Sequence, residues 1–440
     1  MTPDEKHAYA RQFSVHVGVD TAKLFHVLVA QGPEGRRSKP FRVLVSRAGF
    51  EAAYAHLQSL FPGLAPAQML VGLEFAGHHG FTFARFLAAR GYPVVNVLPA
   101  HTNRSKELED NSPLKTDAKD AAQIARLVSQ GIFVRFPFLT TPYVELRLLS
   151  VQRHRLTVEA TRFKNRLQGV LDLAWPEFLG QFSGLHKRTP LAILERWPLP
   201  AEFVAAAPQT VGRHIQAASR GHVSTERVAQ LRTSARETIA LTQATPERRL
   251  EITQLLARWA LVREQLAEVE ARIAVLVEQC PEAKALLSVP EIGAACAATL
   301  VAELGTPADF QHPRQVLKLA GMNLTGRQSG QTEGRRRQSK RGRPMLRRQL
   351  FLLAGRWCQP RGLYRPEYEA MRARGVPGTK AVCSLARKLV PLLLRIMQTG
   401  QLFDEARWRG NRRRPDSTAP APVLRVGARA ADARSLMVDV

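Results

Sequence analysis

The sequence predicts an α/β domain followed by a mostly helical remainder, and three observations indicate this fold class. Short β-branched runs alternate with helical stretches as far as residue 131. Apolar residues then keep a heptad spacing over residues 252–280, which is typical of long helices packed along a seam. A helix, a turn containing proline and a second helix follow from residue 286. We therefore divide the chain into four parts. Residues 1–140 form an α/β domain, and residues 141–280 form a helical and coiled-coil region with inserted small helices. Residues 281–405 form a mostly helical C-terminal domain, and residues 406–440 form a disordered basic tail.

The α/β domain opens with three β-branched runs, FSVHVGVD, HVLVAQ and FRVLVS, which are separated by turn-like segments. Such runs predict three consecutive antiparallel strands. The pattern continues as helix, strand, helix, strand and helix, at residues 48–60, 68–73, 80–89, 93–98 and from 117. A three-strand meander followed by alternating helices and strands is the order of an RNase H-like sheet. No glycine-rich phosphate loop follows any of these strands, which disfavours a doubly wound nucleotide-binding fold.

The heptad pattern is the most regular feature of the middle region. It steps by three and four through nine positions: Ile252, Leu255, Trp259, Val262, Leu266, Val269, Ile273, Leu276 and Cys280. A less regular pattern over residues 146–170 predicts a second long helix. The seam predicts a coiled coil, formed either by these two helices of one chain or by two chains. Residues 175–246 between them are punctuated by prolines and predict small helices.

The C-terminal domain opens with LLSVPEIGAACAATLVAEL, which has the outline of a helix-hairpin-helix whose turn amides can face a phosphate. A plain corner between two helices is the alternative interpretation. The chain ends, from about residue 409, in a stretch that is rich in Arg, Pro and Ala and has few large apolar residues. That composition predicts the disordered basic tail.

The charge of the chain points to its partner. Its 440 residues include 64 Lys and Arg against 37 Asp and Glu, a formal net charge of +27. This excess predicts a polyanionic partner, with DNA or RNA as the leading candidate. No run of about 18 apolar residues and no signal peptide are present, so we expect no membrane association. The four cysteines are scattered without a CxxC pair, which argues against a zinc site or disulfide framework and fits a reducing cytosol. Together with a nucleic-acid partner, this predicts a cytoplasmic, nucleoid-associated protein.

Four carboxylates stand out in the α/β domain. Asp117 and Asp120 are three residues apart at the start of the last predicted helix and so lie on one face. Alone, this pair is typical of a solvated helix start. Asp20 and Glu74, however, each end an apolar strand, where an unpaired charge is costly to hold. If these strands are neighbours, the four acids converge and need a cation between them, and their hard oxygens suit Mg²⁺ or Mn²⁺.

Three stretches of the α/β domain, HVGVDTAK, VGLEFAGHHG and SPLKTDAKDAAQIARL, resemble the N-terminal domain of the DEDD transposases of the insertion sequence 110 family, relatives of Piv-type DNA invertases. Further on, LLSVPEIGAACAATLVAELG and GRQSGQTEGRRRQSKRGRPMLRRQL are similar to the C-terminal transposase domain of the same family. The resemblance covers residues 15–131 and 286–354, in the same order.

The resemblance implies a RuvC-like fold whose four acids bind Mg²⁺ (or Mn²⁺): Asp20, Glu74, Asp117 and Asp120. It also implies a nucleophile, Ser329, whose hydroxyl attacks a DNA phosphate and forms a covalent phosphoserine link. Ser339 is the rival serine and is more typical of a phosphate contact. Members of the family use a structured non-coding RNA to pair with DNA. The resemblance therefore implies DNA and guide RNA as partners, and the heptad seam suits assembly of the chain into dimers and a tetrameric synapse.

Basic residues flank the predicted catalytic residues, and we expect them to contact the backbone of DNA or guide RNA. They are Lys115, Lys119, Arg327, Arg335, Arg336, Arg337, Lys340, Arg341, Arg343, Arg347 and Arg348. A solvated basic loop is the alternative interpretation. His78 and His79, which follow Glu74, are more typical of packing than of metal binding.

The sequence departs from the family pattern in two places. Ala76 stands where a Thr commonly precedes the glycine, and Glu291 follows Pro290 where a glycine commonly opens the helical hairpin. Neither position is an expected metal ligand or nucleophile. The Glu291 carboxylate would repel a phosphate, which weakens the expectation that the hairpin amides bind one.

Three functions remain open from the sequence. The first is a metal-dependent DNA recombinase, a transposase, with Ser329 as its nucleophile. The second is a hydrolytic RuvC-like junction nuclease that uses the four acids alone. The third is a non-catalytic nucleic-acid-binding scaffold with a degenerate site, against which the presence of all four acids counts.

Overall fold

The computed structural model describes residues 1–75, 77–105, 116–136, 138–326, 328–329, 332–333 and 336–412. The chain divides into two compact units, Met1–Leu139 and Thr140–Val440, and each is described by itself. The first unit is an α/β domain, and the second is helical apart from two short β-ladders. This mixed, mostly helical architecture with one central sheet confirms the predicted α/β plus α class. The finer division of the helical part into separate domains stays a prediction.

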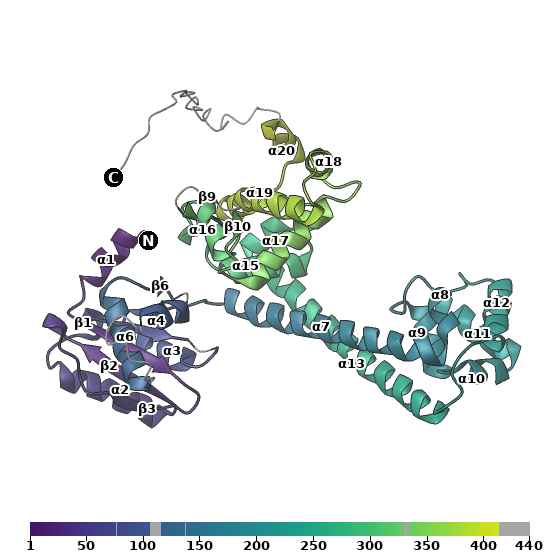
Figure 1. The fold of residues 1–440 in the computed structure, drawn as a ribbon, viewed down its shortest axis with the longest axis horizontal. Coiled ribbons are helices and arrows are strands. Elements are labelled where there is room, and N and C mark those ends of the chain that lie inside the picture. The colour runs from purple at the N-terminus through teal and green to yellow at the C-terminus, as the bar shows by residue number, and fades with distance from the viewer. Residues whose placement is uncertain are drawn as a thin grey trace, which may run out of the picture. The chain divides into compact units, whose positions relative to one another are not determined.

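A six-stranded mixed sheet forms the centre of the first unit (Figure 1). Its order is β3-β2-β1-β4-β5-β6. The strands are β1 (Val15–Thr21), β2 (Phe25–Gln31), β3 (Phe41–Leu44), β4 (Met69–Glu74), β5 (Val94–Val97) and β6 (Val134–Arg135). The first three form an antiparallel meander, β4 and β5 run parallel to β1, and β6 pairs antiparallel with β5. This sheet is consistent with the predicted RNase H-like domain.

Helices cover both faces of the sheet. Those described in this unit are α1 (Pro3–Ala10), α2 (Arg47–Leu60), α3 (Phe81–Ala89), α4 (Pro99–Ser105) and α6 (Asp117–Ser129). Because side chains alternate along a strand, Val17 and Val19 of β1 point to one face, where they share a core with α2 and α3. On the opposite face, Leu70 of β4 packs with Ile124 and Val128 of α6. The predicted helix that begins at Asp117 therefore lies against the sheet.

The second unit is built from helices of very different lengths. They are α7 (Tyr143–Ala174), α8 (Pro176–Gly180), α9 (Arg188–Arg196), α10 (Pro200–Ala205), α11 (Pro208–Ser219), α12 (Thr225–Arg236), α13 (Thr245–Glu278), α14 (Pro281–Leu286), α15 (Ala294–Leu304), α16 (Pro313–Leu319), α17 (Pro344–Trp357), α18 (Arg365–Ala373), α19 (Gly378–Thr399) and α20 (Glu405–Arg412). In the described part of the chain, none of the helices is both long and apolar enough to span a bilayer.

The two longest helices, α7 and α13, pack along each other (Figure 1). Leu156 of α7 shares a core with Ile273 late in α13, whereas Leu171 late in α7 shares another core with Ile252 early in α13. The pair is therefore antiparallel. Eight of the nine predicted heptad positions are buried. The seam is thus covered within one chain, so a dimer would need another surface, and a supercoiled geometry stays a prediction.

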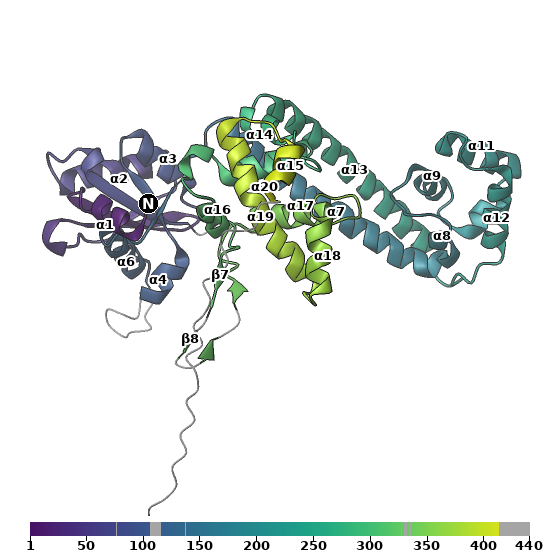
Figure 2. The same cartoon turned by 90° about the horizontal axis from the view of Figure 1, so that it is seen from above.

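Five short helices, α8 to α12, connect α7 to α13, as the sequence predicts (Figure 2). Trp175, Phe178 and Phe203 lie in their common core. Arg232 is 7% exposed, and its guanidinium caps α10, because it donates hydrogen bonds to the carbonyl oxygens of Phe203, Val204 and Ala206 at 2.8–3.3 Å. This insert therefore shares one core with the adjoining ends of α7 and α13.

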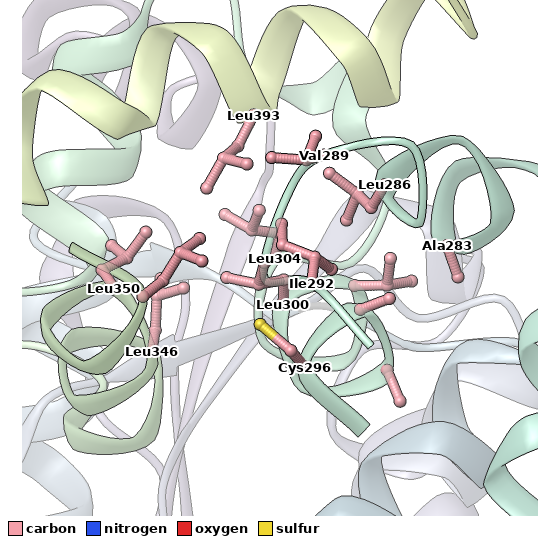
Figure 3. Packing of buried hydrophobic residues seen from close by; sticks show 14 of the residues in the cluster. Ala283, Leu286, Val289, Ile292, Cys296, Leu300, Leu304, Leu346, Leu350 and Leu393 are labelled. Atoms are coloured by element: carbon pink, nitrogen blue, oxygen red, sulfur yellow. The ribbon is translucent and has the colours of Figure 1, made fainter. Parts of the chain in front are cut away.

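The remaining helices form a bundle around α15. Every residue of α15 from Cys296 to Leu304 is buried. Figure 3 shows Leu300 and Leu304 of α15 in one core with Leu350 of α17 and Leu393 of α19. An almost uniformly apolar helix of this kind is stable only at the centre of a bundle.

Helix α20, at Glu405–Arg412, lies where the disordered tail was expected to begin, at residue 406. Its Trp408 ring lies 5.6 Å from that of Trp357 and 5.7 Å from that of Tyr364. A single indole buries enough apolar area to hold one more helix against the bundle. Residues 413–440 lie outside the described residues.

Candidate active site

The register of the sheet places two of the predicted metal ligands side by side. β1 and β4 are neighbouring parallel strands, and Asp20 is the register partner of Glu74. Since side chains alternate along a strand, both carboxylates lie on the face that α6 covers. Both residues are half-buried. The sequence analysis required these two strands to be neighbours if the acids were to converge, and they are neighbours.

Two glycines allow α6 to approach this face. Gly18 and Gly72 are register partners two residues before the acids, so each strand carries the sequence Gly-x-acid. A Cβ atom on Gly18 would lie 2.1 Å from the carbonyl oxygen of Ala121 and 2.3 Å from the amide nitrogen of Ala125, both in the backbone of α6. One on Gly72 would lie 2.2 Å from a methyl carbon of Val128. The sequence analysis missed this role, although the repeated spacing is a readable signal.

The start of α6 carries the other two acids. Thr116 caps the helix, because its hydroxyl accepts a hydrogen bond from the N–H of Lys119 at 3.2 Å. Asp117 is exposed, whereas Asp120 is only 5% exposed. Asp120 lies one turn before Ile124, which packs on the sheet. The interpretation as a solvated helix start therefore fits Asp117 but not Asp120.

The structure pairs Asp20 with Glu74 but does not gather all four acids at one point. Among the described residues, no three His, Cys, Asp or Glu side chains lie close enough to bind a single metal ion. The donor chemistry nevertheless fits a hard cation, since two carboxylates from adjacent strands lie on the same face of the sheet. The site of four ligands stays a prediction.

Two polar residues beside the acid pair were missed by the sequence analysis. Thr21 ends β1, is 4% exposed, and donates from its hydroxyl to the main-chain carbonyl of Glu74 at 2.6 Å. His26 of β2 is the register partner of Thr21, is 1% exposed, and contacts the rings of Phe50 and Phe83. The available signal was the presence of polar residues at the ends of otherwise apolar strands.

His26 is neutral at neutral pH. Its burial, together with the nearby His79, lowers the pKa of the ring from 6.5 to about 4. The N–H of Ala22 donates to Nδ1 at 3.3 Å, which places the ring proton on Nε2. Within the described part of the chain, Nε2 has no hydrogen-bond partner. The rings of His78 and His79 contact each other, with centroids 4.4 Å apart, but His78 is exposed, so their packing role stays a prediction.

Ser329 lies in a β-hairpin of the second unit (Figure 2). The base of the hairpin is the antiparallel pair of β7 (Leu324–Thr325) and β10 (Arg337–Gln338), and β8 (Gln328–Ser329) pairs with β9 (Thr332–Glu333) beyond it. Ser329 is the register partner of Thr332. The backbone of the predicted nucleophile is therefore held in an antiparallel ladder.

The rival serine, Ser339, has a structural role at the base of this hairpin. Its hydroxyl donates to the side-chain oxygen of Asn323 at 2.6 Å, and its N–H donates to the main-chain carbonyl of Asn323 at 2.9 Å. These two bonds join the arms of the hairpin. Since its hydroxyl proton is given to a neutral amide rather than to a general base, Ser339 is poorly suited to be a nucleophile.

Five of the predicted basic contacts are exposed: Arg336, Arg337, Lys340, Arg341 and Arg348. Lys119 is half-buried in the first turn of α6. Three more lie outside the described residues: Lys115, Arg327 and Arg335. The exposed side chains have room to meet a phosphate backbone, so the expectation that they bind nucleic acid stays open.

Arg343 and Arg347 differ from these residues because they brace the protein itself. Both are half-buried. Arg343 donates to the main-chain carbonyl of Glu303, and burial, with Arg147 nearby, lowers the pKa of its guanidinium. Arg347 donates to the carbonyls of Ala320 at 2.9 Å and Lys340 at 3.3 Å. These bonds give both arginines a structural role, whether or not they also contact nucleic acid.

The turn between α14 and α15 is the predicted helix-hairpin-helix turn. Glu291 has a positive φ of 66°, a conformation that favours glycine. The carbonyl of Pro290 accepts a hydrogen bond from Trp357 Nε1 at 2.8 Å, and that of Glu291 accepts one from Arg356 at 3.1 Å. The turn is therefore anchored on α17, and its binding of phosphate stays a prediction. The other departure from the family pattern, Ala76, lies outside the described residues.

Two family models match this chain. A model of DEDD transposases of the IS110 type, described as transposase, matches residues 17–176, and a model described as transposase of the IS116/IS110/IS902 family matches residues 283–365. The first range includes all four acids and the second includes the Ser329 hairpin. Both ranges contain the stretches that carry the resemblance seen in the sequence.

Two curated relatives are similar along most of their length. The insertion element IS110 uncharacterized 43.6 kDa protein of Streptomyces coelicolor is 27% identical over 294 residues, which are 66% of this chain and 72% of the relative. The insertion element IS116 uncharacterized 44.8 kDa protein of Streptomyces clavuligerus is 25% identical over 405 residues, 90% of this chain and 98% of the relative. With matches to both transposase models in the expected order, this chain belongs to the IS110 family of DNA transposases.

Proposed function

We propose that this transposase cleaves and exchanges DNA strands in a metal-dependent reaction that passes through a phosphoserine intermediate. The observation that carries the proposal is the register pairing of Asp20 with Glu74 on the face covered by α6. Two carboxylates side by side on one face of a sheet offer the hard oxygen ligands that a divalent cation prefers.

The four acids would hold Mg²⁺ or Mn²⁺, with Asp20 and Glu74 from the sheet and Asp117 and Asp120 from α6. A bound ion of this type neutralises charge on the scissile phosphate and on the attacking and leaving oxygens. The protein itself supplies hard oxygen ligands and partial exclusion of water, since Asp120 is 5% exposed and Asp20 and Glu74 are half-buried. The ladder and helix positions would hold these ligands before DNA arrives.

Ser329 would be the nucleophile of the reaction. Its oxygen forms a bond to phosphorus while a phosphorus–oxygen bond of the DNA strand breaks, so the serine loses a proton and the leaving sugar oxygen gains one. Attack by a sugar hydroxyl of another strand then breaks the serine–phosphorus bond and returns the proton. The number of phosphoester bonds is unchanged, so neither water nor a nucleotide cofactor is consumed. The ladder that holds Ser329 supports this role by fixing its backbone.

DNA and a structured non-coding guide RNA would be the partners, bound by a homo-oligomer of this chain, a dimer or a tetrameric synapse. The net charge of +27 and the exposed arginines beside the hairpin support the binding of nucleic acid in the cytoplasm, at the nucleoid. In such a complex, base pairing would read the sequence while the protein reads shape and backbone. The braced pair Arg343 and Arg347 would keep the arginine-rich loop in place.

Trapping of a covalent adduct tests the chemical step. The purified protein is incubated with Mg²⁺ and a supercoiled plasmid that carries the reading frame with its flanking DNA, together with RNA transcribed from those flanks. We expect a protein–DNA adduct that survives denaturation and disappears in Ser329→Ala but not in the matched variant Ser339→Ala. Free cleaved ends that persist in Ser329→Ala would instead indicate a hydrolytic junction nuclease.

The same assay tests whether the acids are catalytic. Asp117→Ala is expected to abolish adduct formation while binding of the plasmid, followed by gel shift, remains. A non-catalytic scaffold would give the opposite pattern, with every activity and every response to metal unchanged in Asp117→Ala. Sequencing of RNA that copurifies with the protein tests the guide: a single structured species encoded beside the reading frame is expected, and a random sample of cellular RNA would exclude it.

A further inference from the structure

Thr21 connects the two strands that carry the acid pair. It follows Asp20 directly and is the last residue of β1. Its hydroxyl donates to the main-chain carbonyl of Glu74, across the gap between β1 and β4, at 2.6 Å. Thr21 is 4% exposed, so this hydrogen bond is shielded from water. If the hydroxyl were lost, the carbonyl of Glu74 would be left without a hydrogen-bond donor.

The methyl group of Thr21 has a contact of its own. The chain that leaves β4 returns to β1 at Gly80, which has a φ of +87° and precedes α3. A Cβ atom on Gly80 would lie 2.6 Å from Cγ2 of Thr21 and 3.1 Å from its Cβ. Only a glycine therefore fits against this threonine. Because Thr is branched at Cβ, one rotamer serves both the hydroxyl contact and the methyl contact.

The carbonyl that Thr21 binds belongs to a predicted metal ligand. Glu74 is the last residue of β4, and its register pairing with Asp20 is the last of that ladder. Beyond this point the chain leaves the sheet, so the peptide group after Glu74 is held less well by backbone pairing. A shift of the Glu74 backbone at this strand end would move its Cα–Cβ bond, and with it the carboxylate, away from Asp20, which is also the direction favoured by repulsion between the two carboxylates.

We propose that Thr21 is a positioning residue that holds the backbone of Glu74, so that the Glu74 and Asp20 carboxylates face the same divalent cation. Thr21 itself does not bind the ion. The inference rests on the proposed function, since it requires the acid pair to be a metal site. It goes beyond that function by assigning a role to a residue on the opposite face of the strand, where side chains point into the core shared with α2 and α3.

Three variants of the full-length protein separate the hydroxyl from the methyl group. Thr21→Val keeps the shape and loses the hydroxyl, Thr21→Ser keeps the hydroxyl and loses the methyl, and Thr21→Ala loses both. The readout is the affinity for Mn²⁺ without nucleic acid, measured by loss of the electron paramagnetic resonance signal of free Mn²⁺. We expect about tenfold weaker binding in Thr21→Val and Thr21→Ala, since loss of a group that orients a ligand typically costs 10–100-fold. Thr21→Ser is expected to stay close to the wild type.

Two controls complete the experiment. Ser129→Ala removes a hydroxyl that donates to the Arg126 carbonyl at 2.8 Å, at the end of α6 away from its two acids, and should leave Mn²⁺ affinity unchanged. Asp20→Asn should abolish binding and so define the site. The thermal unfolding midpoint in EDTA is recorded for each variant, since a purely structural role would lower the midpoint and leave the affinity of the folded protein unchanged.

The outcomes distinguish the inference from the function on which it rests. If Thr21→Val and Thr21→Ala bind Mn²⁺ as tightly as the wild type while Asp20→Asn does not bind it, the positioning role is wrong and the metal site stands. If the wild type does not bind Mn²⁺, or if Asp20→Asn binds Mn²⁺ as tightly as the wild type, the proposed metal site is wrong. The positioning role of Thr21 is then wrong as well. Should Thr21→Val fail to fold, the comparison of Thr21→Ser with Thr21→Ala carries the same test.

Discussion

Gly18 of β1 and Gly72 of β4 are register partners, and the backbone of α6 lies directly against Gly18. Asp20 and Glu74 occupy the next positions on the same face of the same strands. The distance between α6 and the sheet therefore sets how closely the acids at the start of α6 can approach the pair on the sheet. The glycines are part of the site although they have no chemistry of their own.

Replacement of Gly18 by alanine should unfold or strongly destabilise the first unit. The added Cβ would meet the backbone of α6 at 2.1 Å, and backbone cannot move aside as a flexible side chain can. Overpacking of a well-packed core costs about 1–3 kcal/mol and occasionally more, and we expect the upper end. Urea unfolding followed by circular dichroism measures the change.

Gly169→Ala is the matched control for this substitution. Gly169 is exposed in the middle of α7, and no atom lies within 4 Å of the position of an added Cβ. Alanine there should stabilise the chain by about 0.5–1 kcal/mol because it favours the helix. A Gly18→Ala variant that unfolds at the same urea concentration as the wild type would show that α6 does not rest on β1.

Removal of one charge from the acid pair should stabilise the metal-free protein. In EDTA, Asp20→Asn and Glu74→Gln each relieve repulsion between register partners, which is worth about 0.2–1 kcal/mol. The thermal unfolding midpoint is therefore expected to rise by up to about 4 °C. Addition of Mg²⁺ should raise the midpoint of the wild type but not that of either variant.

Glu34→Gln provides the control, because it removes an exposed charge elsewhere in the first unit. It should leave both the midpoint in EDTA and the response to Mg²⁺ unchanged. Lower stability of Asp20→Asn in EDTA would mean that Asp20 is held by hydrogen bonds it needs as an anion, and an unchanged response to Mg²⁺ would place the metal elsewhere.

The strand ends could be predicted from the sequence to within one residue, because the apolar runs stop at Asp20 and Glu74 while β1 ends at Thr21 and β4 at Glu74. The first three strands and the alternating helices and strands after them could also be predicted, but the pairing of β1 with β4 was left as a condition and β6 was not predicted. The role of Gly18 could not be predicted, because it depends on a helix a hundred residues further along the chain crossing above one particular position of β1. Long-range contacts of this kind leave no local signal.

The same limit explains the residues whose surroundings were not foreseen. Asp117 and Asp120 look alike in the sequence, but the angle at which α6 meets the sheet exposes one and buries the other. Trp408 lies in a basic stretch and was counted with the tail, yet its ring packs against those of Trp357 and Tyr364. Composition describes a segment on average, whereas packing depends on single side chains.

His26 predicts a stability that decreases in mild acid. Its pKa is about 4 in the folded chain against 6.5 in the unfolded chain, so between these values only the unfolded chain takes up the proton. This contribution to stability is fully present above pH 6.5 and is lost as the pH falls toward 4. The shift corresponds to about 3 kcal/mol at about 1.4 kcal/mol per pKa unit.

Urea unfolding between pH 4 and 7.5 measures this dependence. His26→Leu keeps an apolar side chain beside Phe50 and Phe83 and should remove most of the slope between pH 4 and 6.5. The exposed His222 serves as the control, and His222→Gln should keep the slope of the wild type. A slope that is the same in His26→Leu would assign the acid sensitivity to other groups.

Glu291→Gly should stabilise the second unit. The φ of 66° at Glu291 is unfavourable for a residue with a Cβ atom by about 1–2 kcal/mol, and glycine removes this penalty. Glycine also gains freedom in the unfolded chain, so the net gain expected in the free energy of unfolding is about 0.5–1 kcal/mol. Thermal unfolding of the full-length chain measures this gain.

Glu291→Gln is the matched variant, since it removes the charge and keeps the Cβ atom. It should not gain stability. Both variants should bind DNA more tightly if the turn faces phosphate. Equal stabilisation by glutamine and glycine would show that the charge of Glu291, and not its backbone conformation, is what this turn tolerates poorly.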